Sequence, residues 1–197
     1  SQDKRLEMLW RHTVTVAKSA EFIATWLNAS ISPEDAYMAG LFHDCAIPVL
    51  IKKFQIADTY FGGGSPAGEL IRREEAACGT NHALVGGIMA KSWGMTREIS
   101  QSIKYHHVTS LKEIDDDACH SMWFIVRVAD FVAERVFWGG GLDNYEYLFN
   151  KLDTSSGYLN SMQIDQYTLE KIGVSGQMLN ELINDMNDFI TLDDADL

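Results

Sequence analysis

The sequence places a histidine and an aspartate side by side in an apolar run, GLFHDCAIPVL, at residues 40–50. Ionisable side chains are costly to bury unless they are paired or bind a cation, so His43 and Asp44 need an explanation. Imidazole and carboxylate together are a ligand set that suits divalent Fe, Mn, Ni or Zn, and a carboxylate can bridge two such ions. The pair is therefore a candidate metal-binding site.

Histidines recur through the first 120 residues of the chain, and most of them lie at or near the end of a predicted helix or on its inner face. A single histidine on an apolar face is usually a hydrogen-bonded structural residue, so none of them taken alone indicates a metal. Their joint occurrence leaves two explanations open: a shared cation, or a core of hydrogen-bonded histidines that binds no metal. The six are His12, His43, His82, His106, His107 and His120.

The elements that carry these histidines are predicted to be helices. Apolar residues recur at three- and four-residue intervals from Leu6 to Leu27, which indicates an amphipathic helix. Ser32 and Pro33 are typical of the start of the next helix. Pro48 lacks an N–H and bends or restarts the chain just after the His-Asp pair. Adjacent helical side chains point about 100° apart, so this pair can converge on an ion only off a helix end.

Further helices are predicted at 67–77, at 82–105 with an interruption around Gly94, at 117–137, at 145–152 and at 166–190 with a break at Gly173 and Gly176. Glycine-rich loops are predicted at 62–66 and 139–141. No segment shows the sustained two-residue alternation of a strand. The predicted fold class is therefore all-α, with about six to eight helices.

Composition and charge exclude several functions. A chain of 197 residues with 46% hydrophobic residues suits one folded domain. The 16 Lys and Arg against 28 Asp and Glu give a net charge of −12, which disfavours nucleic acid and anionic membranes as partners. Three widely spaced cysteines indicate neither a disulfide framework nor a zinc-thiolate site. Because the cysteines show no disulfide pattern, we expect a cytoplasmic protein. No apolar run reaches the roughly 18 residues of a membrane span.

The order of these residues resembles the metal-ligand series of the HD superfamily, and more narrowly the HDOD family of HD-related output domains in bacteria. The resemblance covers about the first two-thirds of the chain and implies an HD-domain-like helical bundle. HDOD proteins typically carry further helices ahead of the first matching segment, so an N-terminal part of the family pattern is expected to be missing. The matching segments are LWRHTVTVA (9–17), AYMAGLFHDCAIPVL (36–50), EEAACGTNHALVGGIMAKSWGMTREISQSIKYHH (74–107) and FIVRVADFVAERV (124–136).

The resemblance implies a ligand set. Related HD phosphohydrolases hold one metal with the first His, the His-Asp pair and a late Asp, and hold a second with the intervening histidines. Two metals about 3.5 to 4 Å apart would polarise a phosphoryl group and activate a bound water. Asp44, which would bridge the two metals, is the expected catalytic residue. The expected cofactor is one or two ions of Fe, Mn, Ni or Zn. Carried over, His12, His43, Asp44 and Asp130 hold one ion, and His82, His106 and His107, with Asp44 bridging, hold the other.

Two departures from the catalytic pattern disfavour hydrolysis. Catalytic relatives commonly follow His-Asp with a short stretch ending in Gly-Lys, whereas Cys45 to Pro48 follow here, and the Gly-Tyr-Pro signature of cyclic-dinucleotide hydrolysis is absent after His107. Phosphate contacts would then come from other cations. The candidates are Arg127, Lys104 and Arg11, although a position along a helix surface is favoured for each of them.

Glu74 and Glu75 precede His82 by eight and seven residues. Either carboxylate could orient a ligand histidine by bonding to its other ring nitrogen, or both could be surface residues. We expect residues 1–140 to form an HDOD-like core, with residues 141–197 as a helical extension packed on the same domain.

Three functions follow as hypotheses. The favoured one is a signalling or regulatory output domain that retains a divalent-metal cluster and acts through a protein partner. The alternative is a metal-dependent phosphohydrolase acting on a nucleotide or another small phosphoester. The third is a structural domain whose histidines bind no metal. The sequence leaves open whether the protein is an enzyme.

Overall fold

The protein is a bundle of helices in the computed structural model, which describes residues 2–28, 30–56, 67–138, 162 and 164–193. None of the described residues forms a strand, so the predicted all-α class is confirmed. The helix predicted at 145–152 and the loops at 62–66 and 139–141 lie outside the described residues. The α-helices are α1 (Gln2–Trp26), α2 (Pro33–Phe42), α3 (Ile47–Phe54), α5 (Ala67–Cys78), α6 (His82–Ser92), α7 (Arg97–Tyr105), α8 (His120–Trp138), α11 (Gln166–Ile172) and α12 (Gly176–Asp193).

Local sequence signals set the ends of α2 and α3. Ser32 caps α2, and its hydroxyl accepts a hydrogen bond of 3.0 Å from the Asp35 N–H, with Pro33 in the first turn. The chain then leaves the helix after Phe42 and restarts as α3 with Pro48 in its first turn. The predicted break therefore falls between the two helices, and the four residues 43–46 that form it include the His-Asp pair.

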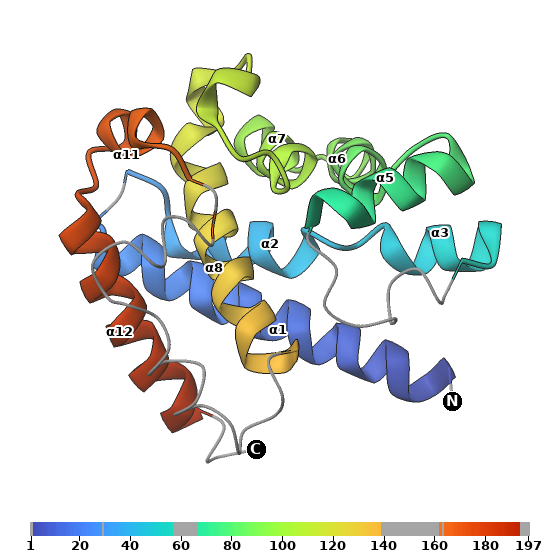
Figure 1. Cartoon of the computed structure of the whole chain (residues 1–197), viewed down its shortest axis with the longest axis horizontal. Coiled ribbons are helices and arrows are strands. Elements are labelled where there is room, and N and C mark those ends of the chain that lie inside the picture. The colour runs from blue at the N-terminus through green and yellow to red at the C-terminus, as the bar shows by residue number, and fades with distance from the viewer. Residues whose placement is uncertain (1, 29, 57–66, 139–161, 163, 194–197) are drawn as a thin grey trace.

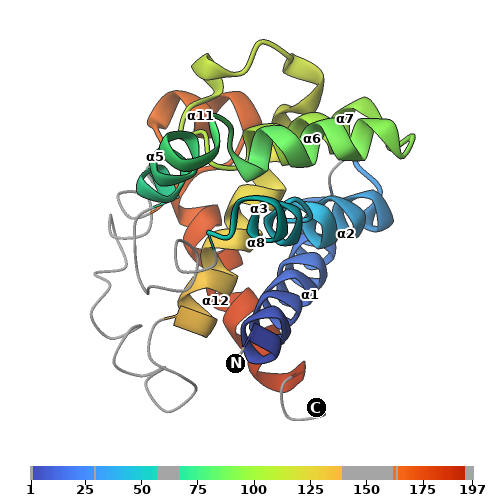
Figure 2. The ribbon, with the colours of Figure 1, turned by 90° about the vertical axis from the view of Figure 1, so that its right-hand side faces the viewer.

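The helices α6 and α7 form a tight antiparallel pair. Asn81 caps α6 through its side chain, Thr96 caps α7 in the same way, and Gly94 adopts a positive φ of 78° in the turn between them. A Cβ on Gly87 would lie 2.8 Å from the Lys104 Cβ, so only glycine allows this close approach. In Figure 2 the two helices lie side by side above α2.

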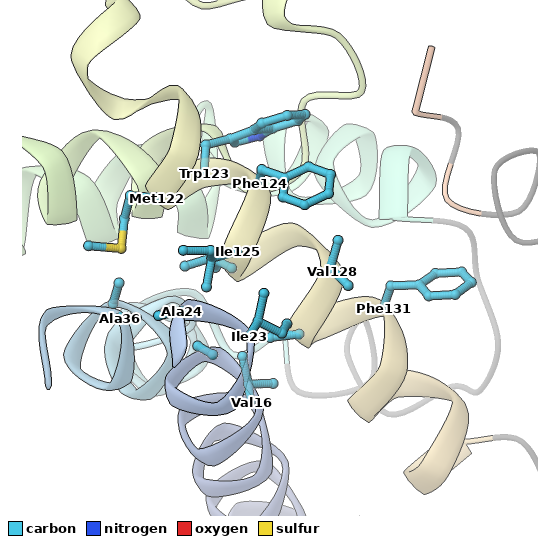
Figure 3. Packing of buried hydrophobic residues seen from close by; sticks show 14 of the residues in the cluster. Val16, Ile23, Ala24, Ala36, Met122, Trp123, Phe124, Ile125, Val128 and Phe131 are labelled. Atoms are coloured by element: carbon cyan, nitrogen blue, oxygen red, sulfur yellow. The ribbon is translucent and has the colours of Figure 1, made fainter. Parts of the chain in front are cut away.

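The helix α8 runs through the middle of the molecule and contributes a long buried stretch to the core. All residues from Met122 to Ala133 are buried. Figure 1 shows α8 with α1 and α2 next to it and α12 along one side. In Figure 3, Ile23 of α1 lies beside α8 between Ile125 and Val128, with Val16 next to Ile23. A helix buried on nearly all sides can carry a polar residue only where a polar partner meets it, which makes Asp130 in this segment notable.

The described part of the C-terminal segment packs against the first helices. The Trp26 indole N–H donates to the Asp185 carboxylate at 2.8 Å, and the Phe22 and Phe189 rings stack with centroids 4.9 Å apart. The Ser110 hydroxyl donates to Asp165 at 2.8 Å. These contacts join α11 and α12 to the core formed by α1 and α8. Among the described helices, none has the length and hydropathy needed to cross a bilayer.

Replacing Gly40 tests the contact between α1 and α2. A Cβ on Gly40 would lie 2.9 Å from both the Ala17 Cα and the Val16 carbonyl oxygen, which are backbone atoms that cannot rotate away. Gly40→Ala gains about 1 kcal/mol of helix propensity but should lose more to overpacking, for a net loss of roughly 1 to 3 kcal/mol in the free energy of unfolding. Urea unfolding measures this loss. Met38→Ala, on the exposed side of α2, is the control and should change stability much less. Equal stability of Gly40→Ala and wild type would contradict the tight contact.

Candidate metal centre

The fold brings together all seven residues that the sequence analysis proposed as ligands. They come from separate places in the chain: the middle of α1, the turn after α2, the start of α6, the end of α7 and the buried part of α8. Six of the seven are buried and His107 is half-buried. The histidine that stands outside the proposed set, His120, lies elsewhere, with its Nε2 3.5 Å from Asp117. The seven are His12, His43, Asp44, His82, His106, His107 and Asp130.

Asp44 lies at the centre of the cluster, and its two carboxylate oxygens face different histidines. Oδ2 lies 3.2 Å from the His43 Nε2 and 3.9 Å from the His12 Nε2. Oδ1 lies 3.2 Å from the His82 Nε2 and 3.6 Å from the His106 Nε2. One carboxylate thus belongs to two neighbouring groups of donor atoms. Within each group, all the donor atoms lie within 4.8 Å of one another. This is the arrangement of a carboxylate that can bridge two cations.

Asp130 closes the side of the cluster formed by α1 and α8. Its Oδ1 lies 3.2 Å from the His12 Nε2 and 3.6 Å from the His43 Nε2. Burial by itself raises the pKa of Asp130, but the hydrogen bonds to His12 and His43 outweigh it and hold that pKa well below its usual value. Asp130 is therefore an ionised carboxylate inside an otherwise apolar helix.

Hydrogen bonds on the far side of three rings fix which nitrogen faces the cluster. The His43 Nδ1 donates to the Gly40 carbonyl at 2.6 Å, and the His106 Nδ1 donates to the Ile103 carbonyl at 2.6 Å. A carbonyl can only accept, so Nδ1 carries the proton in both rings. The neutral form of each ring then presents the Nε2 lone pair to the cluster. Such backbone partners are typical of histidines that bind metals.

Glu74 does the same for His82. Its carboxylate is fully buried, accepts from the His82 backbone N–H at 2.7 Å, and lies 2.7 and 2.8 Å from the His82 Nδ1. The same ring presents its Nε2 to the His107 Nε2 at 2.8 Å and to the His106 Nε2 at 3.4 Å. Converging ring nitrogens repel each other unless a proton or a cation lies between them. The neighbouring carboxylate Glu75 is exposed and instead accepts from the Asn81 side chain at 2.8 Å.

The pKa values show that the cluster attracts positive charge. Burial by itself lowers the pKa of His43, but the carboxylates of Asp44 and Asp130 outweigh it and raise that pKa well above 6.5. Burial also lowers the pKa of His82, yet its hydrogen bonds to Asp44 and Glu74 raise it to about 9. Without a metal, protons on these two rings supply the positive charge that the carboxylates require.

The remaining groups are poised to bind a cation. Burial by itself raises the pKa of Asp44, but the surrounding imidazoles, and first among them the positive charge of His43, outweigh it and bring that pKa well below its usual value. Burial lowers the pKa of His106. Burial also lowers the pKa of His107, and the neighbouring imidazoles of His106 and His82 lower it further, to well below 6.5. Ionised carboxylates and neutral imidazoles are the forms in which these side chains bind metals. The donor set of nitrogen and oxygen atoms therefore fits a divalent transition metal.

Two of the three cations proposed for phosphate binding bond to residues outside the cluster. Arg127 is buried in α8, and its Nη2 donates to the Met162 carbonyl at 3.1 Å. Lys104 donates to the Tyr105 hydroxyl at 2.9 Å and lies over the same ring. Arg11 is exposed on α1. The described bonds therefore direct the Arg127 Nη2 toward Met162 and the Lys104 ammonium toward Tyr105.

Glu134 is a nearby carboxyl group that the sequence analysis did not single out. It lies one turn after Asp130 on α8 and is half-buried. Burial and the charge of Asp130 raise the pKa of Glu134 to about 8, so this carboxyl is mostly protonated at neutral pH. The four-residue spacing from Asp130 is the signal that could have indicated it.

Similarity to known proteins agrees with this geometry. The profile of the HDOD domain matches residues 1–109, which is more than half of the chain. A solved structure described as "Putative phosphohydrolase from Shewanella amazonensis SB2B" has a TM-score of 0.58 and 16% sequence identity to this chain. The alignment covers 90% of this chain and 59% of that one, so this chain spans less than two-thirds of its length. At this identity the similarity supports the fold alone. No curated protein matches the chain.

The bond between Glu74 and His82 should depend on pH in the metal-free protein. Because the pKa of His82 is raised from 6.5 to about 9, the stabilisation is complete below about pH 6.5 and is lost as pH rises through about 9. Glu74→Gln removes the negative charge, so the pKa of His82 should fall toward 6.5. Titration of the ring protons by NMR measures the fall, and urea unfolding should show a larger loss of stability at pH 6 than at pH 9. Glu75→Gln is the matched control, and an unchanged His82 pKa in Glu74→Gln would contradict the assignment.

Proposed function

Because the chain belongs to the HDOD family, we propose that it is a regulatory output domain in which a divalent-metal cluster joins the helices of the bundle and a protein partner reads its state. The observation that best supports the proposed metal cluster is the position of the Asp44 carboxylate, because each of its oxygens faces a different set of histidine nitrogens. The expected ions are one or two of Fe, Mn, Ni or Zn. A cation shared by five helix segments would stabilise the fold, because the unfolded chain offers no such site.

A regulatory role fits the surroundings of the cluster better than phosphoryl chemistry does. No lysine follows the His-Asp pair in the sequence, and Arg127 and Lys104 bond to Met162 and Tyr105. A phosphoryl group gathers negative charge in its transition state and is normally held by Arg or Lys as well as metal. The signalling partner is expected to be a protein, since the charge of −12 disfavours nucleic acid.

A metal-dependent phosphohydrolase is the second candidate, and the two donor groups that share Asp44 favour it. Two bound ions would polarise a phosphoryl group and lower the pKa of a water. In that reading Asp44 and Asp130 would hold the cations, while Glu74 would keep the His82 ring oriented. Glu134, with its raised pKa, could retain a proton near the site. The substrate would be a nucleotide or another small phosphoester.

Metal analysis tests the proposal directly. The purified chain should contain divalent transition metal, measured by elemental analysis after expression in metal-supplemented medium. Asp44→Ala should deplete the metal more than His107→Ala, because Asp44 belongs to both donor groups. His120→Ala, a histidine outside the cluster, is the control and should leave the content unchanged. Wild-type metal content below about a tenth of an equivalent would rule out both candidate functions.

Turnover separates the two candidates. The metal-loaded chain is assayed on phosphomonoesters, nucleotides and cyclic nucleotides with Mn, Fe or Ni added. A regulatory domain should show no turnover above that of Asp44→Ala under any of these conditions. Hydrolysis by the wild type that Asp44→Ala abolishes and His120→Ala retains would establish the phosphohydrolase instead, with a loss expected to exceed about a hundredfold.

A further inference from the structure

The two donor groups that share Asp44 differ in chemistry. The first, which we call the carboxylate-rich group, consists of two imidazoles and two carboxylates. The second, the imidazole-rich group, has three imidazoles and only the shared carboxylate. The carboxylate-rich group is His12, His43, Asp44 and Asp130, and the imidazole-rich group is His82, His106, His107 and Asp44.

The surroundings increase this difference. In the imidazole-rich group the Glu74 carboxylate accepts from the outer nitrogen of His82, whereas the outer nitrogen of His43 in the carboxylate-rich group donates to the Gly40 carbonyl. A carboxylate behind an imidazole makes that ring a stronger donor. In the carboxylate-rich group, Asp130 itself lies among the donor atoms, 3.2 Å from His12. An ion in the first group would meet two ionised carboxylates, and an ion in the second would meet mainly neutral nitrogen.

Ligand type selects the metal. Carboxylate oxygen suits Mn²⁺, whereas imidazole nitrogen suits Zn²⁺ and Ni²⁺. Affinity for any nitrogen and oxygen site also rises from Mn²⁺ to Zn²⁺, so abundant zinc would enter both groups. The selective condition is therefore limiting zinc with manganese in excess, where the difference between the groups decides the distribution.

We propose that the two groups hold different metals, with zinc or nickel in the imidazole-rich group and manganese in the carboxylate-rich group. The inference rests on the proposed metal cluster and adds to it a mixed-metal centre. Glu74 is then a positioning residue for the ion of the imidazole-rich group, because it bonds to both the backbone N–H and the ring of His82.

Anomalous diffraction from wild-type crystals tests the distribution without any substitution. The metal-stripped protein receives excess Mn²⁺ and then about one equivalent of Zn²⁺, and data are collected at the absorption edges of both metals. Zinc signal should lie beside His82, His106 and His107, and manganese signal beside His12, His43 and Asp130. Zinc found equally in both groups, or in the carboxylate-rich group, would overturn the inference and leave the proposed metal cluster intact. No metal at either place would overturn both.

Calorimetry with Glu74→Gln supplies an independent readout. The first equivalent of zinc should bind about 10- to 100-fold more weakly to this variant than to wild type, while the affinity for manganese in the carboxylate-rich group should change much less. Circular dichroism verifies that the variant is folded. Glu75→Gln, whose carboxyl is exposed and bonded to Asn81, is the matched control and should bind both metals as wild type does. Equal weakening of zinc and manganese in Glu74→Gln would contradict a role confined to one group.

Discussion

The structure depends on a buried concentration of negative charge and lone pairs that requires a cation. Asp44 and Asp130 are ionised inside the bundle, and histidine nitrogens converge on them from α1, α6 and α7. Burying such groups without compensation is costly, so protons or metal ions must complete the cluster. The neighbouring carboxylates raise the pKa values of His43 and His82, so in the absence of a metal these rings hold protons that supply the positive charge. A metal would supply that charge while linking helices that are distant in sequence.

The rest of the fold can be understood as support for that cluster. Gly40 lets α2 approach α1 closely, and its carbonyl orients His43. Gly87 lets α6 approach α7, which brings His82 near His106. The buried Glu74 carboxylate bonds to the His82 ring and holds its orientation. Polar groups with so many fixed partners are expected to hold a single geometry, because each bond restricts the next.

Family and fold leave the activity open, since one fold serves many functions. The shared carboxylate is what a dinuclear hydrolase would need, but the basic residues near the ligands in sequence bond elsewhere in space. A metal cluster that joins five segments of a bundle can also serve as a structural link whose loss changes the surface offered to a partner. The unlike donor sets of its two halves are compatible with either use, and under the mixed-metal proposal they would make the response depend on which metals are available.

The sequence by itself predicted the helices that the structure describes and the residues that are candidate ligands. The caps at Ser32 and Asn81 and the breaks at Pro48 and Gly94 are local signals, and the resemblance to the HD superfamily was sufficient to group the seven candidate ligands. Only the tertiary structure decided that Glu74 rather than Glu75 holds His82 and that Arg127 bonds to Met162. These outcomes depend on which side of a helix meets a distant segment, and spacing along one helix cannot specify that partner.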